Sequence, residues 1–129
     1  GILGTNAAID YISQIDLDAV HEHEVSLNRV MSSILKDVDG MKIIGPEDAA
    51  KRGGICSILF DTVDSHDIAI LLDEAADVMV RSGMHCVHSW FNGKGLDRGS
   101  LRASAYLYNT EDEVRLFAET LVEAVEALG

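Results

Sequence analysis

Cys86 is the residue of this sequence with the clearest potential for chemistry. It lies between His85 and His88 in a stretch that has no regular hydrophobic period and contains three glycines. A loop thiol near histidine or arginine can have a lowered pKa, and the thiolate is the reactive form of cysteine. The alternative interpretation is a cysteine packed under Trp90 or Phe91. Both interpretations fit the residue types, and the sequence alone leaves them open.

Two arginines are placed to bind an anion beside this thiol. Leu101–Tyr108 alternates apolar and polar residues, so Arg102 points away from the apolar face of a predicted strand. Arg81 ends a short predicted strand, Val78–Arg81, with the parity that also faces away from the core. A guanidinium group matches a carboxylate with two parallel hydrogen bonds. The alternative is that both arginines are surface residues paired with acids, and the spacing alone favours it.

The histidines do not indicate a metal site. His85, Cys86 and His88 are three candidate ligands, but a fourth ligand at a usual zinc spacing is missing. His21 and His23 are two residues apart on a predicted helix, so they point to different faces and cannot chelate one ion together. We therefore expect no metal in this chain.

The order of the predicted helices and strands indicates an α+β fold, with helices packed on one face of a small, mainly antiparallel sheet. The first third is predicted to form two helices, the second of which is capped by Asp16 or Asp18. A third helix is capped by Ser65, and the last begins with a capping box at Thr110. Residues 47–54 and 84–99 are predicted loops, and a loop as long as the second is usually functional. The predicted strands are Met41–Ile44, Ile55–Thr62, Val78–Arg81 and Leu101–Tyr108.

Composition limits the classes of function. The 129 residues fit one domain, and 22 acidic against 10 basic side chains give a formal charge of −12. This charge argues against nucleic acid and anionic membrane as partners, since phosphate binding needs clustered Lys and Arg. Cys56 lies in an apolar run and is predicted to be buried, so the two cysteines do not form a disulfide. We expect a soluble cytoplasmic protein, and the start at Gly1 suggests an excerpt of a longer chain.

Several motifs in order resemble the closing portion of Suf-type cysteine desulfurases, which are pyridoxal-phosphate enzymes of the class V aminotransferase group. These motifs are Arg-Ser-Gly-Met-His-Cys at 81–86, Leu-Arg-Ala-Ser at 101–104 and Tyr-Asn-Thr-Glu at 108–111. Upstream, residues 1–4 are similar to the family's glycine-rich entry to the first helix, and residues 43–46 to its strand-turn before the central sheet. The resemblance covers almost the whole chain.

The resemblance implies roles for individual residues. Cys86 matches the cysteine that takes sulfur from the substrate as a persulfide, and Arg102 matches the main arginine for the substrate carboxylate. Arg81 matches an arginine at the active-site mouth, and His85 matches a histidine beside the cysteine whose role is less defined. Met84 is a departure, because many relatives have a second histidine there.

The resemblance also implies that residues 1–129 are the C-terminal small domain of the enzyme, and that the large domain holds the cofactor lysine. The intact enzyme would be a homodimer that uses pyridoxal phosphate, takes sulfur from L-cysteine and passes it to an acceptor or scaffold protein for iron–sulfur cluster assembly. The excerpt alone would be inactive, because its electron sink is missing. Two alternatives stay open: another class V reaction, such as selenocysteine cleavage or transamination, and a non-enzymatic docking module for a sulfur-transfer partner.

Overall fold

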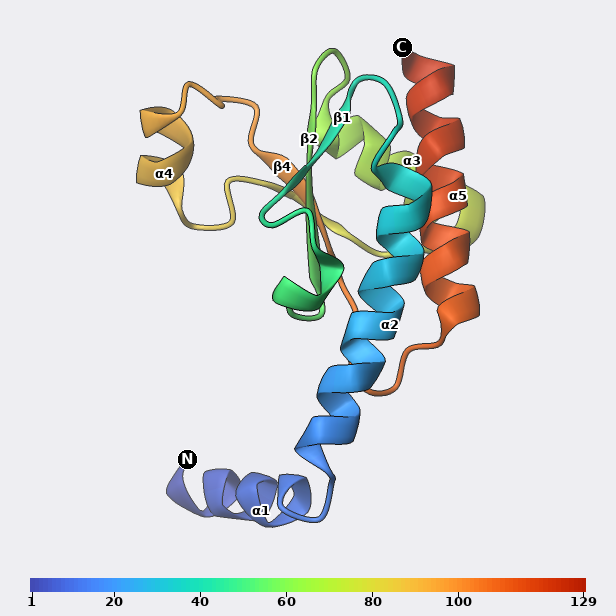
Figure 1. Cartoon of the computed structure of the whole chain (residues 1–129). Coiled ribbons are helices and arrows are strands. Elements are labelled where there is room, and N and C mark those ends of the chain that lie inside the picture. The colour runs from blue at the N-terminus through green and yellow to red at the C-terminus, as the bar shows by residue number, and fades with distance from the viewer.

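The computed structural model describes residues 1–129 and contains one four-stranded sheet (Figure 1). The strand order is β1-β2-β4-β3, and every neighbouring pair is antiparallel. β2 and β4 are the central strands, and β1 and β3 form the two edges. The strands are β1 (Met41–Ile44), β2 (Ile55–Phe60), β3 (Arg81–Gly83) and β4 (Ser100–Ser104).

Three long helices cover one face of this sheet and enclose the core. They are α2 (Leu17–Leu35), α3 (Ser65–Ala76) and α5 (Glu111–Leu128), and α5 packs against both of the others. The predicted fold class is therefore confirmed. Apolar side chains of the sheet and of all three helices meet in one cluster, whose fully buried members include Leu27, Met31, Ile58, Ile68, Leu72, Leu101 and Leu121.

The helix starts follow from short polar side chains that accept backbone N–H groups. Of the two predicted caps of α2, Asp16 is the one that accepts hydrogen bonds from the backbone of the first turn, and Asp18 lies inside the helix. Thr110 and Glu113 form the predicted capping box of α5, with Thr110 N donating to Glu113 Oε2 over 2.8 Å. The predicted cap of α3 is wrong by one residue. Asp64, not Ser65, accepts from the backbone of the first turn, and Ser65 is buried as the first helical residue.

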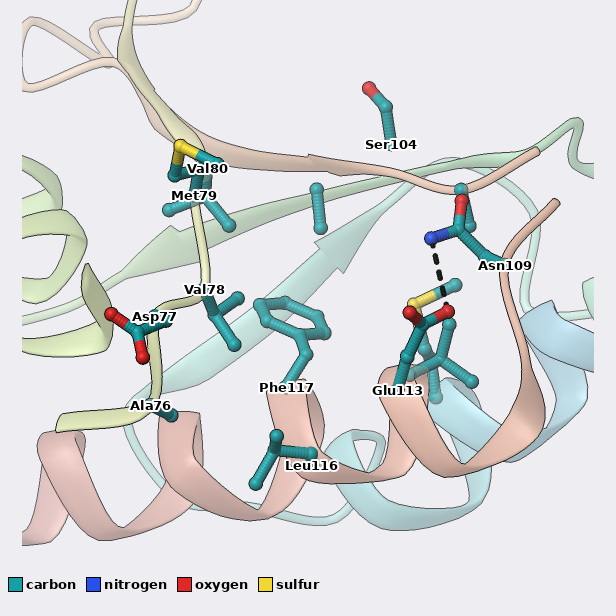
Figure 2. A pocket seen from close by; sticks show the side chains of 14 residues that line it. Ala76, Asp77, Val78, Met79, Val80, Ser104, Asn109, Glu113, Leu116 and Phe117 are labelled. Carbon is teal, nitrogen blue, oxygen red and sulfur yellow. Dashed lines mark hydrogen bonds between the residues drawn. The ribbon is translucent and has the colours of Figure 1, made fainter.

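The edge strand begins three residues later than its hydrophobic pattern predicts. β3 starts at Arg81, whereas Val78 and Val80 pack partly buried against the core without joining the sheet. A cavity of about 420 Å³ lies between these valines, the end of β4 and Phe117 of α5 (Figure 2). The pairing of β3 with β4 covers Arg81–Gly83 and stops where the lining of this cavity begins.

The prediction of a strand up to Tyr108 is also wrong, because β4 ends at Ser104. The next residues turn, with Tyr106 N donating to Asn109 Oδ1 over 2.9 Å and Asn109 N donating to Tyr106 O over 2.9 Å. An asparagine side chain that bonds nearby backbone competes with strand pairing in this way. The turn aims the chain into the capping box of α5. β2 likewise ends at Phe60, two residues before the predicted Thr62.

Both predicted loops contain short helices. A 3₁₀ turn, η1 (Ala49–Lys51), lies in the first loop, and α4 (His88–Gly93) lies in the second, where the buried Phe91 anchors it. The predicted first helix exists as α1 (Ile2–Ile12), but none of its residues is buried and it extends away from the rest of the chain (Figure 1). None of the five α-helices has both the length and the apolar character needed to cross a bilayer.

Candidate functional site

Arg81 and Arg102 lie directly opposite each other on neighbouring strands. The β3–β4 register pairs Arg81 with Arg102, and the β2–β4 register pairs Ser57 with Arg102. Opposite residues of an antiparallel pair have Cβ atoms roughly 5 Å apart and share one face. Because Leu101 and Ala103 belong to the core, this is the face that the helices leave uncovered. The predicted orientation of both arginines is confirmed.

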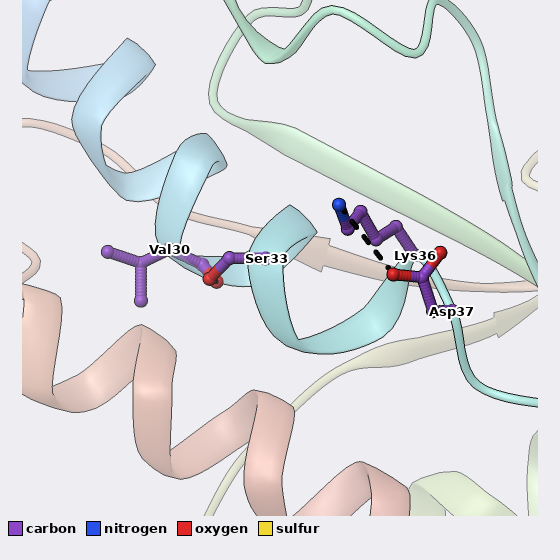
Figure 3. Close-up of polar contacts among 4 residues, drawn as sticks. All are labelled: Val30, Ser33, Lys36 and Asp37. Atoms are coloured by element: carbon purple, nitrogen blue, oxygen red, sulfur yellow. Dashed lines mark hydrogen bonds and ion pairs between the residues drawn. The ribbon is translucent and has the colours of Figure 1, made fainter.

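Neither arginine is paired with an acid. The one ion pair in the structure joins Lys36 and Asp37 over 3.6 Å at the end of α2, on exposed side chains (Figure 3). The alternative in which Arg81 and Arg102 neutralise surface carboxylates is therefore wrong. Two like charges directly opposite each other are unfavourable without an anion between them. This pair is an arrangement that a bound carboxylate would stabilise.

Cys86 lies at the apex of a tight turn that follows β3. His85 and Cys86 have φ values of 50° and 63°, in the left-handed region that non-glycine residues seldom adopt. Val87 N donates to Met84 O over 2.9 Å and closes the turn. Cys86 is exposed, so the alternative of a thiol packed under an aromatic side chain is wrong. The turn presents this sulfur to the solvent.

His85 fastens this turn to β4. Its Nε2 lies 3.1 Å from Ser100 O and 3.0 Å from Ser100 Oγ. Burial lowers the pKa of the imidazole, the positive charges of Arg102 and Arg81 lower it further, and the hydrogen bond to Ser100 opposes them. The neutral ring thus donates from Nε2, and its buried Nδ1 has no hydrogen-bond partner. Arg81 and Arg102 therefore lie close enough to the His85 ring to affect its pKa.

Ser100 is a residue that the motif analysis missed. It has the same parity on β4 as Arg102, and that alternation is the one signal in the sequence that places it on this face. Gly99, the residue before Ser100, allows the start of β4 to approach the end of β3 closely. A Cβ atom on Gly99 would lie 2.5 Å from the carbonyl carbon of Gly83 at the end of β3. Only a residue without a side chain lets the two segments meet so that Ser100 reaches the imidazole of His85.

Other candidate groups lie outside this region. Cys56 is fully buried in β2, as predicted, and burial raises the pKa of its thiol to about 11. His85, Cys86 and His88 do not converge, and the structure has no group of three or more His, Cys, Asp or Glu side chains that could hold a metal. All four lysines of the chain are exposed. A cofactor lysine needs a desolvated pocket to lower its pKa, so the residues of this chain do not fit pyridoxal phosphate by themselves.

The family model for "Aminotransferase class-V" matches residues 1–117 of the chain. The chain belongs to this family. Curated relatives include the probable cysteine desulfurase of Methanothermobacter thermautotrophicus, 34% identical over 95% of this chain, and the cysteine desulfurase of Haloferax volcanii, 35% identical over 97%. The chain spans 31% and 28% of the length of these two relatives.

Solved structures of the family have the same fold. The apo structure of cysteine desulfurase from Thermococcus onnurineus matches with a TM-score of 0.83 and 31% identity, covering 94% of this chain and 30% of that one. The cysteine desulfurase CsdA of Escherichia coli, in an S-sulfonic acid form, matches with a TM-score of 0.78 and 26% identity. It covers 98% of this chain and 29% of that one.

Proposed function

We propose that this chain is the C-terminal small domain of a cysteine desulfurase, with the cofactor site in a large domain outside residues 1–129. The observation that carries the proposal is the pair of guanidinium groups without ion-pair partners, Arg81 and Arg102, on the open face of the sheet, together with an exposed Cys86 on the turn that follows β3. The matches to cysteine desulfurases over nearly the whole chain support it.

In this proposal Arg102 binds the carboxylate of L-cysteine and Arg81 forms the opposite side of the same site. Arg102 is partly buried on the central part of the face and Arg81 is exposed at the edge strand, so Arg102 makes the more desolvated contact. A guanidinium–carboxylate bond of this kind holds the substrate in a fixed orientation. The neutral His85 adds no charge that would compete with the arginines for the carboxylate.

Cys86 then acts as the sulfur acceptor. Its thiolate attacks the sulfur of L-cysteine, an S–S bond forms, and the C–S bond of the substrate breaks with its electron pair left on carbon, so that alanine is released. Cys86 retains the sulfur as a persulfide. This cleavage needs the electron sink that pyridoxal phosphate supplies in the family, so the 129-residue chain alone does not turn over L-cysteine. We further propose a cytoplasmic homodimer that serves iron–sulfur cluster assembly.

The proposal is tested in a protein that joins this chain to the family's cofactor-binding domain. After L-cysteine is added, mass spectrometry of the peptide containing Cys86 should show one additional sulfur atom, which dithiothreitol removes, together with release of alanine. Turnover of L-cysteine without this adduct on Cys86 would contradict the assignment. A preference for selenocysteine, or transfer of an amino group without loss of sulfur, would favour another reaction of the family.

Binding of the substrate carboxylate by Arg102 can be tested separately, with a matched control variant. Arg102→Lys keeps the charge but loses the two-pronged geometry, and we expect KM for L-cysteine to rise about tenfold or more, as for loss of a charge-assisted hydrogen bond worth about 1.5–3 kcal/mol. Arg115→Lys makes the same chemical change on an exposed position of α5 and should leave KM unchanged. Equal KM values for the two variants would show that Arg102 does not bind the carboxylate.

A further inference from the structure

Two buried nitrogen atoms on the open face of the sheet have no hydrogen-bond partner. They are Nδ1 of His85 and Nε of Arg102. The other buried polar atoms without a partner belong to Asn28 and Arg52, which meet beside η1. Nearly all buried polar groups of folded proteins are hydrogen-bonded, so each exception needs an explanation. The two atoms on the open face bear on the carboxylate site, because Arg102 belongs to it.

The strand register places the ring of His85 next to Arg102. The β3–β4 register pairs Gly83 with Ser100, two residues before Arg102. Nε2 of His85 lies 3.0 Å from Ser100 Oγ, which holds the ring beside this part of β4. Side chains two residues apart on a strand share a face and are about 7 Å apart. Burial is the largest cause of the lowered pKa of the ring, and Arg102 contributes more to it than Arg81 does.

The hydrogen-bonding characters of the two atoms are complementary. Ser100 O can only accept, and it lies 3.1 Å from His85 Nε2, so the proton of the neutral ring is on Nε2. Nδ1 then carries a free lone pair, whereas the Nε of an arginine always carries an N–H group. The ring of Phe91, with its centroid 6.3 Å from that of His85, offers no N–H or O–H group to Nδ1.

Arg81 is a less suitable donor than Arg102. Arg81 is exposed, and it lines a cavity of about 490 Å³ together with Asp73 and Glu74 of α3. These carboxylates attract its guanidinium toward α3, although neither forms an ion pair with it. Arg102 has a buried Nε, while its Nη1 and Nη2 are not among the buried atoms. The guanidinium of Arg102 thus has one enclosed nitrogen and two that remain accessible.

We propose that His85 positions Arg102 in the carboxylate site, with His85 Nδ1 accepting a hydrogen bond from Arg102 Nε. The inference rests on the proposed function, in which Arg102 binds the carboxylate of L-cysteine. The structure leaves a gap between the two atoms that rotation of the flexible Arg102 side chain closes. A bond at Nε fixes the plane of the guanidinium and leaves Nη1 and Nη2 as two parallel donors for a carboxylate. His85 is therefore a positioning residue, and Ser100 selects the tautomer that it needs.

The hydrogen bond can be measured on the 129-residue chain without L-cysteine or cofactor. Nitrogen-15 NMR reports which nitrogen of the His85 ring carries the proton, and how fast the Nε–H group of each arginine exchanges with water. We expect the proton on Nε2. We also expect the Nε–H group of Arg102 to exchange at least about tenfold more slowly than that of Arg115, which is exposed on α5. A proton on Nδ1, or equal exchange of the two arginines, would overturn the proposal.

Two substitutions of His85 separate the hydrogen bond from burial. His85→Asn places an amide oxygen close to the position of Nδ1. His85→Gln places its amide close to the position of Nε2 and has no acceptor at the position of Nδ1. Slow exchange of Arg102 should persist in His85→Asn and be lost in His85→Gln. Slow exchange in both variants would mean that burial alone protects Arg102, and fast exchange in both would mean that His85 acts only through the fold of the turn; either result contradicts the proposal, as does the reverse order.

The effect on the substrate can be measured in the protein joined to the cofactor-binding domain, with L-cysteine and its methyl ester as substrates. His85→Gln should raise KM for L-cysteine about two- to tenfold with kcat nearly unchanged, as for loss of one ordinary hydrogen bond. KM for the ester, which has no carboxylate, should not change. A general loosening of the Cys86 turn would affect both substrates alike, and that result would exclude the positioning role.

A double variant tests whether His85 acts through Arg102. Arg102→Lys has no N–H group at the position of Nε, so adding His85→Gln to it should raise KM for L-cysteine no further. A further rise would show that His85 acts by another route. Absence of L-cysteine turnover in the joined protein would contradict the proposed function, and the exchange measurements would still decide whether His85 holds Arg102, because no turnover enters them.

Discussion

Gly99 controls how the Cys86 turn is held against the sheet, and its replacement by alanine should be the most costly single methyl addition in this region. Gly99 has a φ of +71°, and an added Cβ would lie 2.5 Å from the carbonyl carbon and 2.6 Å from the oxygen of Gly83. Both atoms are backbone atoms of the last residue of β3. No side-chain rotation can relieve this overlap, so β3 and β4 must move apart.

Three effects change the free energy of unfolding in Gly99→Ala. An L-residue in the left-handed region costs about 1–2 kcal/mol. Replacing glycine returns roughly 0.4–1 kcal/mol, since the unfolded chain loses freedom. The overlap, treated as overpacking, costs about 1–3 kcal/mol more. The sum is a loss of about 3 kcal/mol in the free energy of unfolding for Gly99→Ala, which a domain with about 5–15 kcal/mol survives.

Gly95→Ala is the matched control in the same loop. Gly95 has a φ of +67°, but an added Cβ would meet no atom within 4 Å. Gly95→Ala therefore introduces backbone strain without an overlap, and the free energy of unfolding should fall by about 1 kcal/mol or less. Urea denaturation of both variants, followed by circular dichroism, gives the two losses. Equal losses would refute the close approach of Gly99 to Gly83, and with it the physical reason for the contact between Ser100 and His85.

Further outcomes follow from the same contacts. Folding lowers the pKa of His85, so the unfolded chain binds a proton at a higher pH than the folded chain does. The contribution of His85 to the free energy of unfolding should therefore be full above about pH 6.5 and fall as the pH drops below it. His85→Gln should flatten this pH dependence in urea titrations at several pH values. Thr110→Ala should cost about 1 kcal/mol of unfolding free energy, because the Thr110–Glu113 capping box is lost. Iodoacetamide at neutral pH should modify Cys86 in the folded chain and Cys56 only after denaturation, as mass spectrometry would show; rapid modification of both would contradict the buried position of Cys56.

Patterns that involve neighbours in the chain were predictable from the sequence. The capping box at Thr110, a cap at Asp16 or Asp18 and the alternation that turns Arg102 outward all depend on groups a few residues apart. The structure confirms the first and the third and selects Asp16 for the second. Element ends were less predictable. The strand expected at Val78 begins at Arg81, next to a cavity that lies between Val78, Val80 and the end of β4. The strand expected to reach Tyr108 stops at Ser104, where Asn109 bonds the backbone of Tyr106.

Contacts between segments that are far apart in the chain could not be predicted from the sequence. Ser100 gave no motif signal, yet it accepts the hydrogen bond that fixes His85, and this contact depends on Gly99 and Gly83 meeting across two strands. The exposure of Cys86 and the absence of an ion pair to Arg81 were equally hidden. Each depends on which side chains other elements bring near.

The sequence by itself determined the fold class, the family and the set of reactive side chains, because these depend on local hydrogen bonding, hydrophobic period and motif order. Only the tertiary structure decided that two guanidinium groups stand opposite each other without ion-pair partners, and that Cys86, on the turn after β3, is exposed. The reason is physical: the electrostatics of a charged group are set by every charge and every layer of burial within a few ångströms, and most of those neighbours are far away in the chain.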